Sequence, residues 1–364
     1  MRLAVILVHY HTPDLAVDAV GALRADLAAA GLAAEWLLVD NGSDAAERSR
    51  LDSLGVRRID PGTNLGYAGG VNLGMASCTA EVVVLMNPDV LVLPGCVPAL
   101  LGRLQAGAAV AGPAFFWDRG RRLLLPPGEA RSRREELFAV LAGRDERWAA
   151  RARRRWRRHA RRHWESRSPL ASHALSGGLL AIRRSAWERV GPFDEGFRLF
   201  FEETDWLLRA RRHGVRSEYV PGAEAIHLYH QSAGAEPRAR QWFEESARRF
   251  RRLHYGAWFA FVLGALARPT RHTADLPALP ESGLDLPRQA AYPLWVEVSP
   301  NPTGFPAAAE RIDAPGGVWR LPEEIGRRLR GETWRVQVTD RHGRELCRGS
   351  LAAAMAQGEQ RGVA

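Results

Sequence analysis

The chain has 364 residues, 46% of them hydrophobic, and a formal net charge of +10. This length allows one large α/β domain with an appendage, and the apolar fraction is that of a globular protein with a sizeable core. The three cysteines, Cys78, Cys96 and Cys347, show neither metal-ligand spacing nor a disulfide framework. A reducing cytosol is therefore the expected compartment.

The apolar segments are too short for membrane insertion. The amino terminus passes directly from a brief apolar run into a strand pattern, unlike a signal peptide. The longest later apolar run, residues 257–267, falls well short of the ~20 residues that span a bilayer. We therefore expect a soluble protein, or one that is peripheral at the inner face of the cytoplasmic membrane.

Strand and helix patterns alternate over the first 90 residues. Residues 14–30 repeat apolar side chains at helical spacing, and residues 62–75 form a glycine-rich turn that leads into a helix. The expected strands are residues 3–8, 35–39, 56–59 and 81–90. This alternation predicts a parallel sheet with right-handed crossovers.

The last of these strands ends in Asn87-Pro88-Asp89. Pro88 lacks a backbone N–H and ends ladder pairing, so Asp89 is delivered to the carboxyl end of the strand. Ligands of open α/β sheets bind at that edge, and a carboxylate there suits a hard divalent cation that bridges to a phosphate. The alternative is an Asp that only caps a turn.

A second acidic strand end is Asp40-Asn41-Gly42-Ser43. In a Rossmann-type sheet an acidic residue at this position commonly accepts hydrogen bonds from ribose hydroxyls. An Asx-turn built by Asp40 and Asn41 is the alternative. The segment from Asn64 to Gly74 (NLGYAGGVNLG) permits close backbone approach to a ligand, but by itself it is a weak nucleotide-binding signal.

These segments together carry a family resemblance. The first strand running into His9-Tyr10, VDNGS at residues 39–43, NLGYAGGVNLG and LMNPDV at residues 85–90 resemble, in order and spacing, the family 2 glycosyltransferases, and within them the rhamnosyltransferase-like branch. The resemblance implies a GT-A (nucleotide-diphospho-sugar transferase) fold of the α/β class, a Rossmann-like mixed sheet flanked by helices. It also implies Asp89 as a ligand of Mg²⁺ or Mn²⁺. The donor-binding residues that it implies are His9, Tyr10, Asp40, Asn41, Asn64, Gly66, Gly70, Asn72, Asn87, Gly177 and Gly178.

An arginine- and tryptophan-rich insertion at residues 119–168 interrupts the strand and helix pattern. Trp148, Trp156 and Trp164 recur every eight residues, which spreads them over a broad helix face. Two interpretations stay open: a solvated helix whose aromatics pack on the catalytic domain, and a helix at a membrane surface. Nucleic-acid binding is a poorer third, because no recognised module accompanies the charge.

After the insertion, residues 175–182 read as a strand and residues 184–190 as a short helix. Glu202, Glu203 and Asp205 follow at the start of another helix, where the macrodipole favours negative charge. This stretch resembles the family's Glu-Asp-x-Asp, in which the second acid is the catalytic base, so the resemblance implies that role for Glu203. The sequence has Glu in place of the usual Asp, and Glu202 and Asp205 stay as rivals.

His227 follows a probable strand at residues 218–226 and matches the family's His with a Ser five residues later. The resemblance implies that His227 approaches the metal or the diphosphate, with His230 as the fallback. A structural histidine is the alternative.

The predicted division is a catalytic domain at residues 1–268, a proline-rich linker at 269–290, a small β-containing domain of unknown role at 291–350 and a tail at 351–364. Residues 242–267 read as helical and mixed basic–apolar.

The expected reaction is inverting transfer of a sugar, with rhamnose from a dTDP donor as the leading choice, to a polysaccharide or lipid-linked glycan. Asp89 would act through the cation, and Glu203 would take the acceptor proton. A nucleotidyltransferase is one alternative, but no basic glycine-rich loop follows the first strand. A non-catalytic scaffold at a membrane or on RNA is the other.

Overall fold

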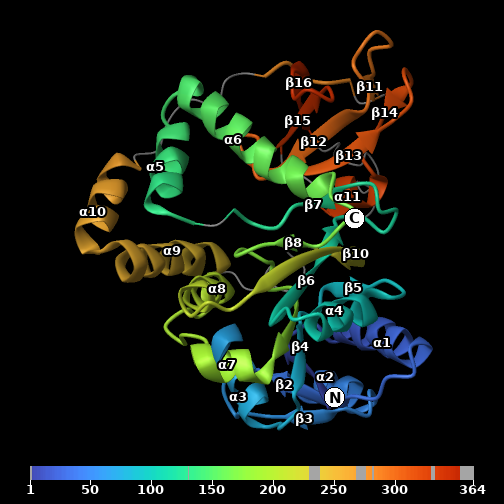
Figure 1. Ribbon diagram of the computed structural model, residues 1–364, viewed down its shortest axis with the longest axis vertical. Coiled ribbons are helices and arrows are strands. Elements are labelled where there is room, and N and C mark those ends of the chain that lie inside the picture. Colours follow the sequence, from blue (N-terminus) through green and yellow to red (C-terminus); the bar gives the residue numbers. More distant parts are fainter. Residues whose placement is uncertain are drawn as a thin grey trace, which may run out of the picture. The chain divides into compact units, whose positions relative to one another are not determined.

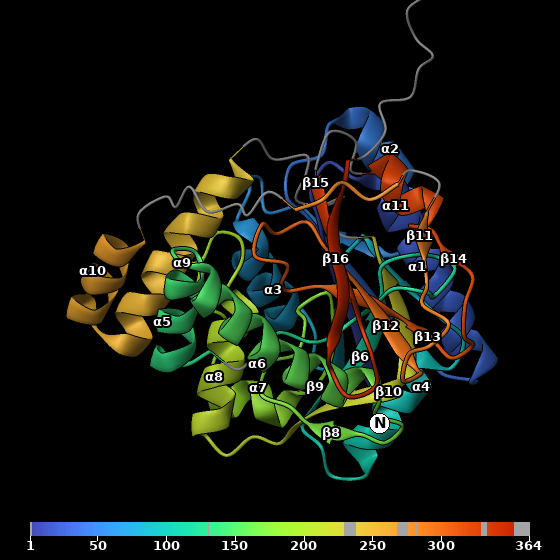
Figure 2. The ribbon, with the colours of Figure 1, turned by 90° about the horizontal axis from the view of Figure 1, so that it is seen from above.

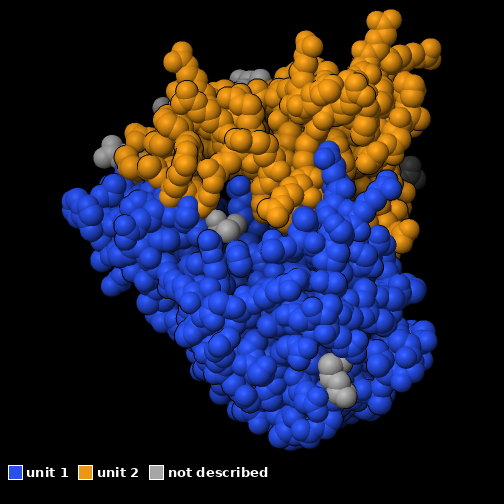
Figure 3. Space-filling model, in the orientation of Figure 1, with its two compact units in different colours: residues 1–115, 127–133, 165–265 blue, residues 116–126, 134–164, 266–364 orange. Residues whose placement is uncertain are grey.

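The computed structural model describes residues 2–129, 131–228, 238–267, 276–280, 283–328 and 333–352. The chain forms two compact units (Figure 3). Unit 1 contains residues 1–115, 127–133 and 165–265, and unit 2 contains residues 116–126, 134–164 and 266–364.

Four parallel strands form the centre of the unit 1 sheet, in the order β3-β2-β1-β4 (Figure 1). They are β1 (Leu3–His9), β2 (Glu35–Asp40), β3 (Arg57–Ile59) and β4 (Val82–Met86). Every residue of β1 and β4 is buried, as expected for parallel strands that are covered on both faces. The predicted parallel sheet is thus confirmed.

Antiparallel strands continue the sheet beyond β4. Strand β9 (Leu179–Arg183) pairs with β4 and with β6 (Val110–Phe116), and β10 (Ser217–His227) pairs with β5 (Val90–Val92) and β8 (Leu170–Ala171). The sheet is therefore mixed, and the predicted α/β class is confirmed.

Helices pack on this sheet, with α3 against β1 and β2 and α4 against β9 and β10. The helices of unit 1 are α1 (Pro13–Ala29), α2 (Ala45–Asp52), α3 (Gly66–Ala76), α4 (Cys96–Gln105), α7 (Arg184–Val190), α8 (Glu202–Arg212), α9 (Ala239–Tyr255) and α10 (Ala257–Leu266).

The helical stretch predicted at residues 242–267 is two helices. Gly256 separates α9 from α10 with a φ of 92°, a conformation that glycine adopts at little cost. Figures 1 and 2 both show α10 at the side of unit 1 farthest from α1.

Unit 2 contains an antiparallel sheet in the order β16-β15-β12-β13-β7. Its strands and helices are β7 (Leu124–Leu125), α5 (Arg133–Ala142, of which Arg133 belongs to unit 1), α6 (Glu146–Trp164), β11 (Leu284–Asp285), β12 (Leu294–Ser299), β13 (Ala308–Ile312), β14 (Val318–Trp319), α11 (Glu323–Arg328), β15 (Thr333–Thr339) and β16 (Glu345–Ala352).

The tryptophan-rich helix α6 packs on the unit 2 sheet. Trp156 and Trp164 are buried, and Trp164 stacks on Trp295 of β12 with ring centroids 5.1 Å apart. Arg157 donates to both carboxylate oxygens of the buried Glu297. The first interpretation expected the aromatics to pack on the catalytic domain, but Trp156 and Trp164 pack on the C-terminal sheet instead. Since these two rings are covered, they are not available to a lipid surface.

Most of the insertion, residues 119–126 and 134–164, belongs to the same compact unit as the C-terminal residues, whereas residues 127–133 and 165–168 belong to unit 1. The predicted division did not group the insertion with the C-terminal residues. The predicted linker contains β11, which pairs with β14 of the same unit. Whether residues 291–350 form a domain of their own stays a prediction. Among the described residues, none of the helices has both the length and the apolar character needed to cross a bilayer.

Candidate functional site

The carboxyl ends of β1, β2 and β4 meet at one edge of the unit 1 sheet. His9 is the last residue of β1 and lies in register with Asp40, the last residue of β2. The turn Asn87–Asp89 follows β4 and is closed by a hydrogen bond from the Val90 amide to the Asn87 carbonyl. Side chains from three strand ends thus gather where open α/β sheets bind ligands.

His9 and Asp40 form a buried polar network at this edge. The Thr12 amide donates to Nε2 of His9, so this nitrogen is unprotonated and Nδ1 carries the hydrogen. Nδ1 lies 3.2 Å from the Ser43 hydroxyl and 3.6 Å from Asp40 Oδ1. Burial lowers the pKa of His9 despite the neighbouring Asp40, which keeps the ring neutral. His9 is therefore a structural residue of this edge, and its contact with a donor stays a prediction.

Asp40 forms an Asx-type turn, the structural role that the sequence offered as the alternative to ribose binding. Its Oδ1 accepts a 3.0 Å hydrogen bond from the Ser43 amide, and Oδ2 lies 3.4 Å from Arg58. Burial acts to raise the pKa of Asp40, but the hydrogen bonds from Ser43 outweigh it and leave the pKa lowered. The carboxylate is thus ionised, and ribose binding by Asp40 stays a prediction.

Asn41 fastens the glycine-rich loop to the strand ends. Its amide group donates to the Gly66 carbonyl at 3.0 Å, and its side-chain oxygen accepts from the Leu65 amide. Gly66 has a φ of 73°, and a β-carbon there would lie 2.6 Å from the Arg198 carbonyl oxygen. The side-chain oxygen of Asn64 accepts from the Gly66 amide. These contacts hold the loop against the segment that precedes α8.

Asn72 and Gly70 fasten the helix that follows this loop. The Asn72 side chain donates to the Phe193 carbonyl and accepts from the Phe193 amide. Gly70 packs on Val8 so closely that a β-carbon would lie 2.7 Å from a Val8 methyl group. The described contacts of Asn72 and Gly70 are structural, and donor contact by either stays a prediction, as it does for the partly exposed Tyr10.

Asp89 and His227 lie next to each other because β5 and β10 pair. His227 lies opposite Val90 in this pairing, and its Nε2 lies 3.5 Å from Asp89 Oδ1. The Leu228 amide donates to the Asp89 carbonyl at 2.8 Å. Asn87 also lies here, and its side-chain oxygen is buried and accepts no hydrogen bond from the described residues.

Gly177 and Gly178 join this pair to the acidic start of α8. A β-carbon on Gly177 would lie 2.9 Å from Cγ of Glu203, and one on Gly178 would lie 3.0 Å from Cε1 of His227. The Gly178 carbonyl accepts from the Asn87 amide at 2.9 Å. The two glycines thus let Glu203 and His227 pack directly on the backbone, and they bring the β4 turn and α8 to one site.

Glu202 and Glu203 differ in exposure. Glu202 is buried, and one of its carboxylate oxygens accepts no hydrogen bond from the described residues, whereas Glu203 is partly exposed. Burial, together with the charge of Glu203, raises the pKa of Glu202 well above its ordinary value. Burial also raises the pKa of Glu203, although hydrogen bonds to its carboxylate and the charge of Arg131 oppose this shift. A partly exposed glutamate with a raised pKa suits a general base.

Asp205 is engaged in a structural ion pair. Its two oxygens lie 2.8 Å from Arg209 Nε and 2.7 Å from His254 Nε2 of α9. Burial acts to raise the pKa of Asp205, but the His254 hydrogen bond and the Arg209 charge outweigh it, and the pKa is lowered. A stabilised carboxylate is a poor proton acceptor, so the geometry favours the two glutamates over this rival.

The segment before α8 is strained. Phe200 and Phe201 have φ values of 68° and 72°, in the left-handed region that bulky residues rarely adopt. Phe201 is buried in an aromatic cluster with Phe197 and Phe250, and the Arg131 guanidinium lies 4.5 Å above its ring. This packing holds the backbone that presents the two glutamates.

Two residues of the site were not predicted from the sequence. The Tyr67 hydroxyl donates to the Gly177 carbonyl, and burial with the charges of Glu202, Glu203 and Asp89 raises its pKa. Tyr67 lies in the glycine-rich segment at residues 64–74, so that motif could have indicated its place in the site. Arg131 lies in a proline- and arginine-rich stretch that contains no motif pointing to the site.

The described residues contain no group of three or more His, Cys, Asp or Glu side chains that could hold a metal ion. Asp89 with His227 is thus a pair of candidate ligands. The fallback, His230, lies outside the described residues.

The sequence profile of glycosyl transferase family 2 matches residues 4–191, more than half of the chain. The chain therefore belongs to this family, and it is a glycosyltransferase. The matched region contains the strand ends, the glycine-rich loop and Gly177-Gly178, while Glu203 and His227 lie beyond it.

Two curated relatives illustrate the family. The N-acetylglucosaminyl-diphospho-decaprenol L-rhamnosyltransferase of Mycobacterium tuberculosis is 32% identical over 222 residues, which cover 55% of this chain and 68% of the relative. The low-salt glycan biosynthesis hexosyltransferase Agl10 of Haloferax volcanii is 25% identical over 199 residues, which cover 53% of this chain and 59% of the relative.

Among solved structures, the mannosyltransferase PcManGT from Pyrobaculum calidifontis, in complex with GDP-Man and Mn²⁺, superposes with a TM-score of 0.46. The sequences are 15% identical, and the match covers 73% of each chain. A likeness at this level does not bear on function.

Proposed function

We propose that this glycosyltransferase transfers rhamnose, with inversion, from a dTDP-type donor to a lipid-linked glycan. The name of the mycobacterial relative, N-acetylglucosaminyl-diphospho-decaprenol L-rhamnosyltransferase, supports this choice. The rhamnosyltransferase-like loop from Asn64 to Asn72 supports it as well.

One observation carries the proposal: the Gly177-Gly178 backbone is in contact with Glu203 on one side and with the His227–Asp89 pair on the other. A carboxylate suited to accept a proton thus lies near groups suited to hold a diphosphate through a cation. Transfer of a sugar from a nucleoside diphosphate to an alcohol requires both.

Glu203 takes the proton of the acceptor hydroxyl as that oxygen attacks the anomeric carbon. A second acid to protonate the leaving group is not required, because a nucleoside diphosphate is a far better leaving group than an alkoxide. Glu202 stays protonated beside it, because its pKa is raised by both burial and the neighbouring charge. Direct displacement of this kind inverts the anomeric centre.

The residues present fit a divalent cation. Asp89 supplies a hard carboxylate oxygen, and His227 supplies a nitrogen that Mn²⁺ accepts more readily than Mg²⁺ does. Two protein ligands are typical of a cation that completes its coordination with water and substrate phosphates. When bound, it would stabilise the negative charge on the departing diphosphate.

The experiment is a thermal-shift screen of the full chain with dTDP-rhamnose, UDP-sugars and GDP-sugars, with and without Mn²⁺. We expect dTDP-rhamnose with Mn²⁺ to give the largest rise in unfolding midpoint, because a ligand that binds only the folded state stabilises it. Asp89→Asn should lose the Mn²⁺-dependent part of that rise, while Asp313→Asn on the surface of unit 2 keeps it.

A larger shift with UDP- or GDP-sugars would overturn the choice of donor, and an undiminished shift in Asp89→Asn would remove Asp89 from the cation site. The family membership itself favours sugar transfer over nucleotidyl transfer and over a non-catalytic scaffold. Since a lipid-linked acceptor lies in a membrane, the proposal includes peripheral membrane contact.

A further inference from the structure

Helix α10 is apolar but poorly covered. Its sequence is AWFAFVLGAL, yet Leu263 is its one fully buried residue. Trp258 is 76% exposed and Phe261 is 69% exposed, and their rings stack with centroids 6.1 Å apart. Large aromatic side chains this exposed mark an interaction surface in a soluble domain.

The neighbouring helix α9 adds to this apolar surface. Leu253 and Phe243 are 53% and 46% exposed, and together with Trp258 and Phe261 they make up half of the large exposed hydrophobic residues among the described part of the chain. Phe243 also packs on Phe200 and Phe201, with ring centroids 5.5 and 5.3 Å apart, and Phe250 and Tyr255 are buried in the aromatic cluster beside α8. These contacts hold α9 in place, and Leu253 is the more exposed of its two large apolar residues.

Positive charge borders the apolar surface. A shallow hollow of about 410 Å³ on α9 is lined by Glu245, Arg248, Arg249, Arg252 and Leu253. Arg249 pairs with Asp194, whereas Arg248 and Arg252 form no ion pair with any described residue. Although Glu245 lines the same hollow, it forms no ion pair with either arginine among the described residues, and two guanidinium groups beside exposed aromatic rings match an anionic headgroup above an acyl layer.

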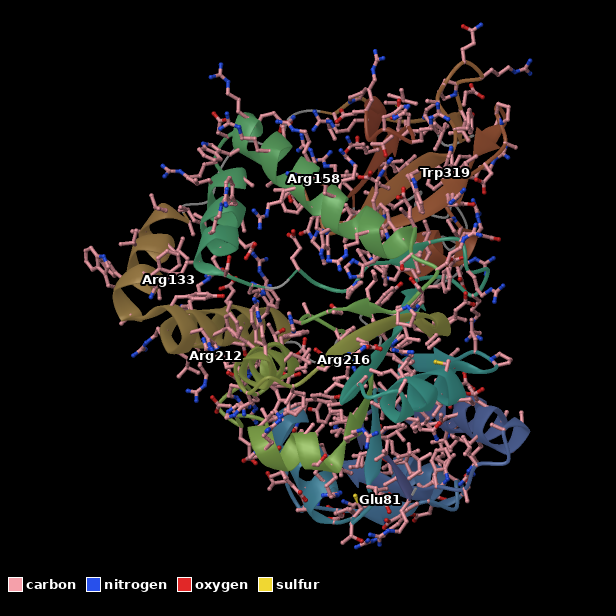
Figure 4. The ribbon with its side chains drawn as sticks, in the orientation of Figure 1. Glu81, Arg133, Arg158, Arg212, Arg216 and Trp319 are labelled. Carbon is pink, nitrogen blue, oxygen red and sulfur yellow. The ribbon has the colours of Figure 1, made fainter. Side chains whose placement is uncertain are left out.

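The base of α10 is fixed to unit 1. Arg133, labelled in Figure 4, donates to the Tyr255 carbonyl at 3.0 Å, and its guanidinium lies 5.9 Å from the centroid of the Phe259 ring. The Tyr255 and Phe259 rings also pack edge to face. A helix held in this way presents Trp258 and Phe261 without unfolding.

We propose that this surface, formed by Arg248, Arg252, Leu253, Trp258 and Phe261, binds the face of a bilayer that contains anionic phospholipids. The aromatic rings enter the interface between headgroups and acyl chains, and the arginines bind lipid phosphates. The proposed contact is with one face of the bilayer, through side chains of α9 and α10. The inference extends the proposed function, but it does not depend on which sugar is transferred.

The test is flotation of the full chain with phosphatidylcholine vesicles, with and without phosphatidylglycerol. We expect the wild type to float with the anionic vesicles. Trp258→Ser/Phe261→Ser removes the rings that enter the interface, and Arg248→Glu/Arg252→Glu replaces two attractive charges by repulsive ones. Each double variant should lower the partition coefficient about tenfold or more, because a single basic residue near an anionic surface contributes roughly fivefold.

Matched controls separate this surface from general stickiness and charge. Val318→Ser/Leu346→Ser removes two exposed apolar side chains of unit 2, and Arg189→Glu/Arg212→Glu makes the same charge change on α7 and α8. Both controls should float like the wild type. Because all of these residues are exposed, every variant should keep the wild-type unfolding midpoint.

Three results would overturn the inference: a wild type that does not float, surface variants that float as well as their controls, or arginine-dependent binding to RNA without flotation. Donor turnover is measured in parallel. Flotation without turnover contradicts the proposed sugar transfer and leaves this inference standing. Turnover without flotation contradicts the membrane contact, here and in the proposed function, and leaves the proposed sugar transfer standing.

Discussion

Glu202 and Glu203 are adjacent in sequence, yet their surroundings give them different protonation states. The buried Glu202 holds its proton more tightly than the partly exposed Glu203, because the pKa of Glu202 is raised by burial and by the charge of its neighbour. One residue can therefore be neutral while the other is ionised, which is the arrangement that acid–base sites commonly use to separate two roles.

Glu203→Gln should lower kcat by about 10²–10⁴-fold, since amide nitrogen and oxygen do not accept the acceptor proton. Glu202→Gln should leave kcat within a few-fold of the wild type, because glutamine resembles a protonated carboxyl group. The measurement is the initial rate of donor consumption, with donor affinity as the control that neither substitution should change much. The reverse pattern would assign the base to Glu202.

The pH dependence of kcat/KM should show the raised pKa of Glu203. The base must be ionised, so activity should fall as the pH drops through a pKa that lies above the ordinary glutamate value of 4.5. A pH series of kcat/KM at a fixed ionic strength gives this value. An acid limb centred below pH 4.5 would contradict the burial that the structure shows.

Gly177→Ala should lower kcat while the fold is retained. The added β-carbon would lie 2.9 Å from Cγ of Glu203, so the side chain must move away from the backbone on which it packs. We expect about a tenfold to hundredfold loss in rate, as small misplacements of catalytic groups produce. Gly222→Ala is the matched control, since a β-carbon there meets no atom within 4 Å.

At the level of elements, α8 is held by its neighbours more than by its own sequence. Two left-handed phenylalanines precede it, and an aromatic cluster with residues of α9 holds them. The Asp205–His254 contact joins the two helices a second time. The position of the acidic residues therefore depends on contacts between segments that are about 50 residues apart.

Asp205→Asn should lower the free energy of unfolding at neutral pH by on the order of 3 kcal/mol, since it leaves Arg209 and His254 without a buried carboxylate. The pKa of Asp205 is lowered in the fold, so its stabilisation is present above the ordinary value of 3.8 and is lost as the pH falls through the lowered pKa. Urea unfolding at neutral pH and at the lowest pH at which the protein stays folded measures both effects. Asp18→Asn, on the exposed side of α1, should change neither.

At the level of the whole molecule, local patterns predicted the elements that the sheet centre requires. The buried valine run of β4, the helices α1 and α3 and the polar strand ends all have signals within a few residues. The helices α2 and α4 and the strands β6 and β13 were not predicted. The α2 helix begins with a capping box from Asp44 and Glu47, a local signal that was available.

The remaining differences come from contacts between distant segments. The stacking of Trp164 on Trp295 and the pairing of Arg157 with Glu297 join residues more than 130 positions apart, so the sequence could not indicate which surface the helix covers. Gly177, Glu203 and His227 are likewise brought together from distant segments of the chain. The family resemblance made this proximity an expectation, but the spacing of the residues in the sequence did not.

The chain has no lysine, so its 51 basic side chains are all guanidinium groups that do not react with acylating agents at neutral pH. We expect exhaustive acetylation of amines to change the net charge by at most one and to leave donor turnover within about twofold of the untreated protein. Intact mass after treatment with hydroxylamine, together with the initial rate, checks this. Loss of turnover after a single acetylation would show that the terminal amine matters.

In the proposed mechanism, the partial exposure of Glu203 also bears on how the enzyme recovers after each cycle. Once Glu203 has accepted the hydrogen ion of the acceptor, both glutamates are uncharged in this proposal, and the next acceptor meets no base until that hydrogen ion departs. Because Glu203 itself touches solvent, water can remove the hydrogen ion directly, and an internal relay of side chains is not needed.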